Sequence, residues 1–254
     1  MTIPRVKIMT PCYGGMLSTN FATSLLDLQA ACAARGISLD WDLRDGGADV
    51  VRAREYCVEA FLNDTAATHL LFIDADIGFS AEQVFRLLDF DADFTAAAYP
   101  LKGLFWDRLA AAAREGHVDP SVSFRYALTW EDGGDAKTLD QFARARSVGI
   151  GFALLRRSAV TKLAEASAVK AVGRVDSAPD DAETSFDAPG LFGCMVDSCT
   201  GMYLSECLAF CHRWTGLGGE IWIDLQSRLT HVGPISFRGD LFSLLEPVPE
   251  TADV

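Results

Sequence analysis

The 254-residue chain lacks any apolar run approaching the roughly 20 residues that a membrane-spanning helix requires. Its first residues also lack the apolar core of a secretory signal peptide. Basic residues are scarce, since 22 Lys and Arg stand against 35 Asp and Glu and leave a net charge of -13. We therefore expect a soluble, cytoplasmic protein, and the acidity argues against broad binding to nucleic acid or to anionic membranes.

Cysteine is limited to seven residues, an odd number scattered along the chain, which is not the pattern of a disulfide framework. Cys207 and Cys211 lie one turn apart on a predicted apolar helix face, which favours buried thiols over a zinc knuckle. The chain also has no Walker phosphate loop, and no Gly-x-Gly-x-x-Gly follows its first predicted strand.

What the chain does have is an apolar run, Leu70 to Ile73, followed directly by Asp74 and Asp76. A short apolar run of this kind predicts a buried strand of a parallel sheet. The two carboxylates then fall at the carboxyl end of the strand, where open α/β sheets bind ligands. Hard oxygen ligands suit Mg²⁺ or Mn²⁺, and such a metal usually also holds substrate phosphates.

Strands and helices are expected to alternate through the first hundred residues, which predicts an α/β fold with a parallel sheet and helices on both faces. Ser80 and Gln83 form a capping-box pattern at the start of one of these helices. Beyond residue 102 the pattern loosens, and we expect a glycine-rich strand over 147–156, a helix over 202–217 and a final strand over 229–232. The polar segment 173–189 is expected to be a mobile loop that closes over the substrate as a lid.

Several phrases of the sequence resemble those of one group of proteins, the bacterial and phage nucleotide-sugar-dependent glycosyltransferases of the GT-A fold. The resemblance covers the chain from Val6 to about Asp240 and rests on the order of these phrases: 69–79, 98–102, 149–152, 203–206, 210–214, 218–222 and 229–233. It implies a Rossmann-type, mixed and mostly parallel sheet in a single domain over 1–254. Residues 1–102 would form the nucleotide-binding half, and residues 103–246 the half that completes the acceptor and metal sites.

The resemblance also implies roles for individual residues. Asp76 would bind Mn²⁺ or Mg²⁺, with Asp74 contributing to the metal site or to the ribose, and His231 would complete the metal shell. Imidazole beside carboxylates suits Mn²⁺. A packed or surface histidine is the alternative for His231, and a solvated strand end is the alternative for the two aspartates.

The nucleoside and the phosphates would lie against a second set of residues: Thr10, Pro11, Tyr13, Asp45, Arg54 and Lys102. Tyr13 could stack on the base, or it could simply cover the sheet edge as a turn aromatic. Arg54 could bind the diphosphate with its guanidinium fork, or it could form an ordinary salt bridge. Solvated surface positions are the alternatives for Asp45 and Lys102.

The chain departs from the resembling group at the position of the catalytic base. The group's expected phrase is Ser-Glu-Asp, whereas this chain has Ser205-Glu206-Cys207. Glu206 is our candidate base, because a base must reach the acceptor hydroxyl from this region. It could instead be a helix N-terminal charge that interacts with the helix dipole.

The resulting hypothesis is a metal-dependent glycosyltransferase of the hexosyltransferase type, which moves a sugar from a nucleoside diphosphate to an acceptor hydroxyl. A nucleotidyltransferase is one alternative. A non-catalytic GT-A-like protein that binds a nucleotide sugar or a glycan is another, and Cys207 favours it. The donor sugar, its base, the acceptor and the inverting or retaining outcome are not specified by these residues.

Overall fold

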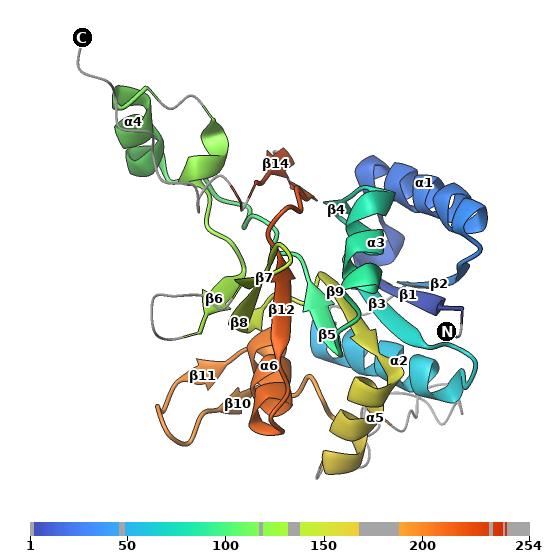
Figure 1. Ribbon diagram of the computed structural model, residues 1–254. Coiled ribbons are helices and arrows are strands. Elements are labelled where there is room, and N and C mark those ends of the chain that lie inside the picture. The colour runs from blue at the N-terminus through green and yellow to red at the C-terminus, as the bar shows by residue number, and fades with distance from the viewer. Residues whose placement is uncertain are drawn as a thin grey trace.

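The computed structural model describes residues 3–45, 49–116, 119–131, 138–167, 188–233, 236–240 and 242. Its centre is a nine-stranded sheet (Figure 1). The main path runs in the order β2 (Ser38–Asp45), β1 (Arg5–Cys12), β3 (His69–Ile73), β9 (Phe152–Arg156), β5 (Phe94–Ala96), β12 (Ile221–Asp224), β8 (Phe142–Val148) and β6 (Leu128–Trp130), and β7 (Thr138–Leu139) pairs with β8. Within this sheet β8 and β9 run opposite to the other strands. The predicted mixed, mostly parallel α/β sheet is therefore confirmed.

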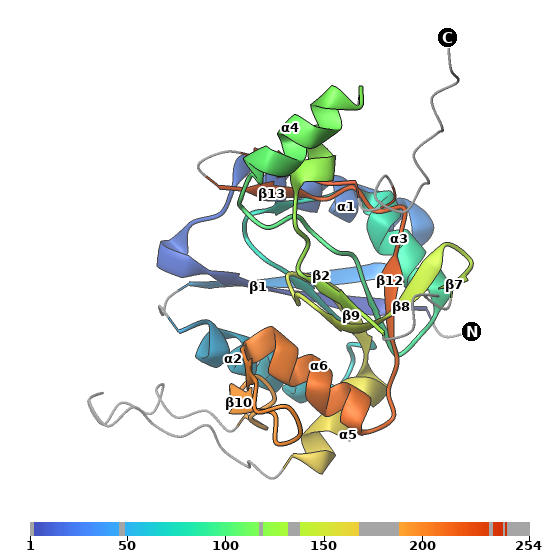
Figure 2. The same ribbon diagram turned by 90° about the vertical axis from the view of Figure 1, so that its left-hand side faces the viewer.

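Helices cover both faces of the sheet, as expected (Figure 2). One face carries α1 (Thr19–Arg35) and α3 (Ala81–Phe90), and the other carries α2 (Val50–Asn63), α5 (Arg157–Ala166) and α6 (Glu206–Gly216). Strand β3 contributes side chains to the core on both faces of the sheet. Leu70 and Phe72 belong to one core cluster, and Leu71 and Ile73 belong to the other. This is the period of two that a strand buried on both faces requires.

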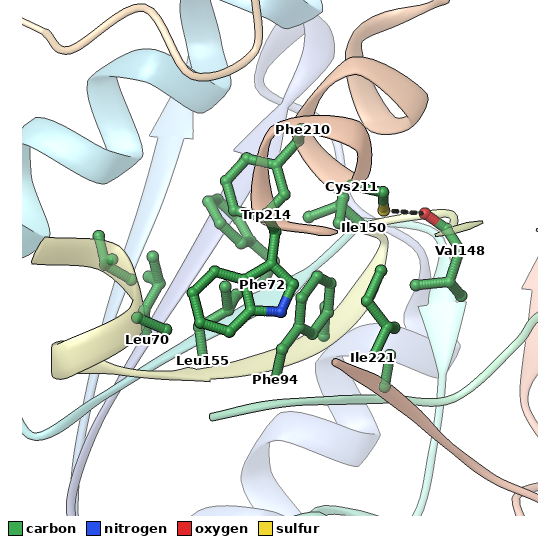
Figure 3. Packing of buried hydrophobic residues seen from close by; sticks show 14 of the residues in the cluster. Leu70, Phe72, Phe94, Val148, Ile150, Leu155, Phe210, Cys211, Trp214 and Ile221 are labelled. Carbon is green, nitrogen blue, oxygen red and sulfur yellow. Dashed lines mark hydrogen bonds between the residues drawn. The ribbon is translucent and has the colours of Figure 1, made fainter. Parts of the chain in front are cut away.

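The core under α6 contains the largest aromatic cluster (Figure 3). Trp214 and Phe210 of α6 pack over Phe72 and Phe94 of the sheet, and Cys211 lies against the carbonyl of Val148 at 3.5 Å from Sγ to O. Burying each of these large side chains contributes roughly 1.5–3 kcal/mol. The packing fixes α6 on the sheet, and with it the helix start that carries Glu206.

Local signals in the sequence explain where the first helices begin and end. The Ser18 hydroxyl accepts the backbone N–H of Phe21 at the start of α1, and Gly36 ends that helix in the left-handed conformation that glycine adopts most easily. Ser80 and Gln83 form the predicted capping box of α3. The helix α4 (Trp106–Arg114) lies away from the sheet in Figure 1 and has no buried residue. No helix in the described ranges is both long and apolar enough to cross a membrane.

The expected single strand over 147–156 is wrong, because the structure divides this stretch into β8 and β9 around a turn at 149–151. Strand β9 enters the sheet antiparallel between β3 and β5, so the parallel run β2-β1-β3 does not continue directly into β5. The glycines allow this turn to pack closely. A Cβ on Gly149 would lie under 3.0 Å from the Tyr99 hydroxyl oxygen, and one on Gly151 would lie under 3.0 Å from Oδ2 of Asp74.

The final predicted strand exists, but it belongs to a separate three-stranded antiparallel sheet. In that sheet β13 (Thr230–Val232) lies between β14 (Ser236–Arg238) and the short β4 (Ile77–Gly78). The pairing places His231 opposite Ile77, one residue beyond Asp76. The sequence-based helix over 202–217 is too long, because a hairpin of β10 (Met195–Val196) and β11 (Tyr203–Leu204) precedes α6. The 3-10 turns η1 (Tyr13–Gly15) and η2 (Pro120–Ser123) complete the described elements. Residues 173–187 of the expected lid lie outside the described residues.

Candidate active site

A cavity of about 460 Å³ lies at the carboxyl ends of β1 and β3. Six of the predicted site residues line it, and they come from five separate elements: Pro11, Tyr13, Arg54, Asp74, Asp76 and His231. The remaining wall is mostly apolar and is formed by Met16, Leu17, Val50, Ala53 and Ala75, together with Ser18. The parallel strands thus bring the predicted residues to one sheet edge, as the position of the aspartates indicated.

Asp74 faces inward and is paired with a buried arginine. Nη2 of Arg54 lies 2.9 Å from Oδ1 and 3.3 Å from Oδ2 of Asp74, and only 3% of Arg54 is exposed. Burial by itself would lower the pKa of Arg54, but Asp74 and weaker neighbouring groups raise it above its usual value. The guanidinium therefore stays charged, and Asp74 neutralises it. Nε and Nη1 of Arg54 have no partner among the described residues.

Asp76 is more open and faces two groups from other segments. Its carboxylate pairs with Nζ of Lys102, and its Oδ1 lies 3.4 Å from Nε2 of His231. Burial would raise the pKa of Asp76, but the contacts with His231 and Lys102 bring it below its usual value. The side chains of Asp76 and Lys102 are each about one-third exposed, at 37% and 35%. The carboxylate of Asp76 can therefore leave Lys102 and bind a ligand without a charge having to move out of the protein interior.

The imidazole of His231 is oriented by its other ring nitrogen. Nδ1 lies 2.8 Å from the carbonyl oxygen of Pro100, which can only accept, so Nδ1 carries the proton. Nε2, 3.4 Å from Oδ1 of Asp76, can donate to that carboxylate when the ring is protonated and can bind a metal ion when the ring is neutral. The ring also packs edge-on against Tyr99, with ring centroids 5.1 Å apart. A carboxylate and an imidazole acceptor held in this way are the ligand types that suit Mn²⁺, with phosphate and water filling the remaining positions.

The structure does not bring Asp74, Asp76 and His231 together as three ligands of one metal ion. Within the described ranges, no group of three or more His, Cys, Asp or Glu side chains is placed to hold a metal ion. Asp76 and His231 form a pair, whereas Asp74 is engaged by Arg54. A metal at this position would accordingly depend on ligands from a bound phosphate.

The other predicted residues lie around the cavity and do not line it. Thr10 is fully buried, and its hydroxyl has no hydrogen-bond partner in the described part of the chain. Asp45 is exposed at the end of β2, where its carboxylate flanks Gly15. Lys102 lies in the segment after β5, and its Nζ pairs with the carboxylate of Asp76.

The first turn of α6 carries Glu206 and Cys207, which lie near Arg54 but do not line the cavity. The Cys207 thiol donates to Oε1 of Glu206 at 3.4 Å and accepts the backbone N–H of Ile150 at 3.4 Å. Burial raises the pKa of Cys207 to about 12. The thiol is therefore protonated near neutral pH and cannot replace an aspartate as a base. Glu206 is half-buried and close enough to Arg54 to influence its pKa.

Tyr99 is a site residue that the sequence analysis did not single out. Its side chain is 7% exposed, touches His231 and forms a hydrogen bond with the backbone of Gly151. Burial raises its pKa well above the usual value, and the nearby Asp74 adds to this. The segment 98–102, which contains Tyr99, contributed to the family resemblance, but nothing in the sequence shows that the Tyr99 ring contacts residue 231.

Comparisons with known proteins bear on the fold. No protein-family model matches the chain, and no curated protein matches it. Among solved structures, A197 from STIV is 14% identical with a TM-score of 0.50, and the match covers 90% of this chain and 86% of that one. At this identity the similarity is one of fold alone.

Two further solved structures match less well. A glycosyltransferase involved in the glycosylation of the major capsid of PBCV-1 is 8% identical with a TM-score of 0.32, over 63% of each chain. A Bacillus anthracis protein assigned as a glucose-1-phosphate thymidylyltransferase, in complex with a sucrose, is 9% identical with a TM-score of 0.41, over 91% of this chain and 89% of that one. At TM-scores below 0.5 these two similarities carry no argument about function.

Proposed function

We propose that the chain is a GT-A-like glycosyltransferase that uses a divalent metal to transfer a sugar, of hexose type, from a nucleoside diphosphate to an acceptor hydroxyl. The observation that carries the proposal is the cavity at the carboxyl ends of β1 and β3, where Asp76 and His231 face each other beside Tyr13. Its volume of about 460 Å³ and its mixed apolar and charged wall are typical of a small-ligand site.

Tyr13 and the neighbouring apolar side chains would form the nucleoside-binding part. Tyr13 is 70% exposed and Met16 is 67% exposed, so both offer apolar surface at the rim of the cavity. A nucleobase that stacks on an aromatic ring and covers this surface removes it from water. Pro11 lies in the same wall, at the end of β1.

Asp76 and His231 would hold Mn²⁺ or Mg²⁺ together with the donor's diphosphate. The metal, when bound, supplies positive charge where negative charge develops on the leaving diphosphate. Lys102 balances the charge of Asp76 in the ligand-free protein and would be free to contact a phosphate once Asp76 turns to the metal. The hydrogen bond from Nδ1 to Pro100 keeps Nε2 of His231 available as a ligand.

Arg54 is buried and contacts the site through its hydrogen bonds to Asp74. Because its Nη2 is engaged by Asp74, we propose that it orients Asp74 toward the ribose. A direct contact with the diphosphate would use Nη1 or Nε, which have no partner in the described residues. Glu206 is the proposed catalytic base. The neighbouring Cys207 cannot take this role, because its thiol is protonated near neutral pH.

Thermal-shift measurements with a series of nucleoside diphosphate sugars, with and without Mn²⁺, test the proposal. A donor that binds only the folded protein raises the melting temperature, and we expect the shift to require Mn²⁺. Release of the free nucleoside diphosphate should accompany it. The Asp76→Ala variant should lose both signals, and Asp107→Ala, which removes an exposed carboxylate on α4, should keep them. Equal Mn²⁺-dependent release by the wild type and Asp76→Ala would refute the assignment.

A non-catalytic protein that binds a nucleotide sugar is the second candidate, and Cys207 favours it. The residue stands where the resembling group has an aspartate, and its thiol is protonated near neutral pH. Under this alternative the wild type shows the Mn²⁺-dependent thermal shift but releases no nucleoside diphosphate.

A further inference from the structure

A second and larger cavity, of about 650 Å³, lies between α1, α3 and the three-stranded sheet. Three arginines line it: Arg86 from α3, Arg228 from the segment before β13, and Arg238 from β14. Their guanidinium groups meet at one cavity although the chain as a whole is acidic, with a net charge of -13. The cavity is separate from the proposed donor site and takes no part in the mechanism above.

The strand pair β4–β13 forms the wall between the two cavities. Thr230 lines the larger cavity, whereas the next residue, His231, lines the donor cavity. Consecutive residues of a strand point to opposite faces, so this alternation is expected of β13. Likewise Gly78 of β4 lines the larger cavity, while Asp76 lines the donor cavity. A ligand in the larger cavity would therefore not overlap the nucleotide.

Two of the arginines are held in place by carboxylates behind them. The fully buried Asp224 accepts Nε of Arg86 at 2.8 Å, and Nη2 of Arg86 also lies 3.3 Å from the Ser227 hydroxyl oxygen. Arg228 forms an ion pair with Asp240, with its Nε 2.8 Å from Oδ2. Each guanidinium keeps further N–H donors, since arginine has five. The pairs thus fix the side chains without using all of their donors.

Arg238 differs from the other two, because it is exposed and has no partner among the described residues. The cavity also contains one carboxylate, Asp27 of α1, which is likewise exposed and without a partner in the described ranges. Asp224 and Asp240 balance the charges of Arg86 and Arg228, so Arg238 supplies the unpaired positive charge of the cavity and Asp27 the unpaired negative one. The guanidinium N–H donors that remain can bind an anionic group through charge-assisted hydrogen bonds.

Neutral polar side chains make up most of the remaining lining. The amide of Gln83, 4% exposed, uses Oε1 to accept the backbone N–H of Ser80, and its NH₂ group has no partner in the described part of the chain. Asn20 and the hydroxyls of Thr19, Thr23 and Thr230 line the same space. Amides and hydroxyls can both donate and accept, which suits a ligand that carries several hydroxyl groups.

From this lining we infer that the larger cavity binds a small hydroxyl-rich molecule with one anionic group, that is, a sugar phosphate or an acidic sugar. The arginines would hold the anion, and the amides and threonines would hold the hydroxyls. Asp27 would limit the affinity for the anion by charge repulsion. The inference does not depend on the proposed function, because none of the residues that carry it lines the donor cavity.

Isothermal titration calorimetry tests the inference with four probes: glucose 6-phosphate, glucuronate, glucose and inorganic phosphate. We expect one of the two anionic sugars to bind more tightly than both glucose and phosphate. Arg238→Gln should weaken that binding by about tenfold, because it removes a charge-assisted contact. Asp27→Asn should strengthen it, a gain that misfolding cannot mimic. Arg114→Gln, which removes an exposed arginine on α4, should leave it unchanged.

The same titration separates this cavity from the donor site. Binding of the anionic sugar should persist in Asp76→Ala and in the presence of a nucleoside diphosphate with Mn²⁺. Displacement by the nucleotide would overturn the inference, as would the absence of saturable binding by both anionic sugars. Phosphate binding as tightly as the tighter of the two anionic sugars would reject the carbohydrate part, and unchanged affinity in both Arg238→Gln and Asp27→Asn would reject the location.

Discussion

The regions around Asp74 and Asp76 differ although the two residues are separated only by Ala75 and line the same cavity. Asp74 is 27% exposed, but the groups behind it are closed off from solvent, because Arg54 is 3% exposed and Tyr99 is 7% exposed. Around Asp76 it is open, since the carboxylate, Lys102 and the cavity are all accessible to solvent. The same side chain at positions 74 and 76 therefore meets two environments. We infer that Asp74 balances the charge of the buried Arg54, whereas the carboxylate of Asp76 is available to a metal ion.

The largest expected effect concerns the charge of Asp74. Asp74→Asn leaves the buried guanidinium of Arg54 without its counter-charge, and removing one partner of a buried pair costs about 3–5 kcal/mol. Asp76→Asn breaks a pair that is about one-third exposed, which costs less than about 1 kcal/mol. Urea denaturation of both variants measures the difference. Equal losses in the free energy of unfolding would contradict the division into a closed and an open region.

A smaller effect is expected from filling the space beside Asp74. Gly151→Ala places a Cβ under 3.0 Å from Oδ2 of Asp74 and 3.0 Å from Cε1 of Tyr99, so the turn must shift. Overpacking of this kind costs about 1–3 kcal/mol. Gly103→Ala is the matched control, because a Cβ there has no neighbour within 4 Å among the described residues. A loss of stability in Gly151→Ala no greater than that in Gly103→Ala would contradict the close packing around Asp74.

The smallest of the three effects depends on pH and concerns Glu55, the residue next to Arg54. Burial raises the pKa of Glu55 above its ordinary value of 4.5, although backbone N–H groups of residues 190–192 oppose the shift. A raised pKa in the folded state contributes stability below the unfolded value, and this contribution is lost as the pH rises through the folded value.

A glutamine side chain does not titrate, so Glu55→Gln should gain stability relative to the wild type as the pH is raised. Urea denaturation between about pH 4.5 and about pH 7.5 follows the difference in free energy of unfolding. A difference that stays constant over this range would indicate that Glu55 titrates normally. The residue lies on the closed side, because its carboxylate accepts the backbone N–H of Phe192, whose ring lies near Arg54.

The sequence predicted the open region better than the closed one, for a physical reason. A strand, its two aspartates and a capped helix are signalled by residues close together in the chain, and β3, Asp76 and the Ser80 cap follow that pattern. The expectation that His231 lies near Asp76 came from the family resemblance, and the structure brings the two together through the β4–β13 pairing.

The closed region depends on contacts that join distant segments. Alternation over 147–156 could not reveal that the chain turns at Gly149–Gly151 or that β9 inserts between β3 and β5. That insertion places Gly151 against Asp74 and Tyr99. The arginine-lined cavity was equally hidden, because its residues come from α1, α3 and the small sheet, and no local pattern connects them.

The affinity for Mn²⁺ in the presence of a nucleoside diphosphate tests whether Asp76 and His231 bind the metal. Electron paramagnetic resonance of free Mn²⁺ can measure it for the wild type, Asp76→Asn and His231→Gln, with Asp107→Asn as the control. We expect Asp76→Asn and His231→Gln each to lose at least about tenfold in affinity, while Asp107→Asn matches the wild type. Unchanged affinity in both Asp76→Asn and His231→Gln would contradict the claim that the open region holds the metal.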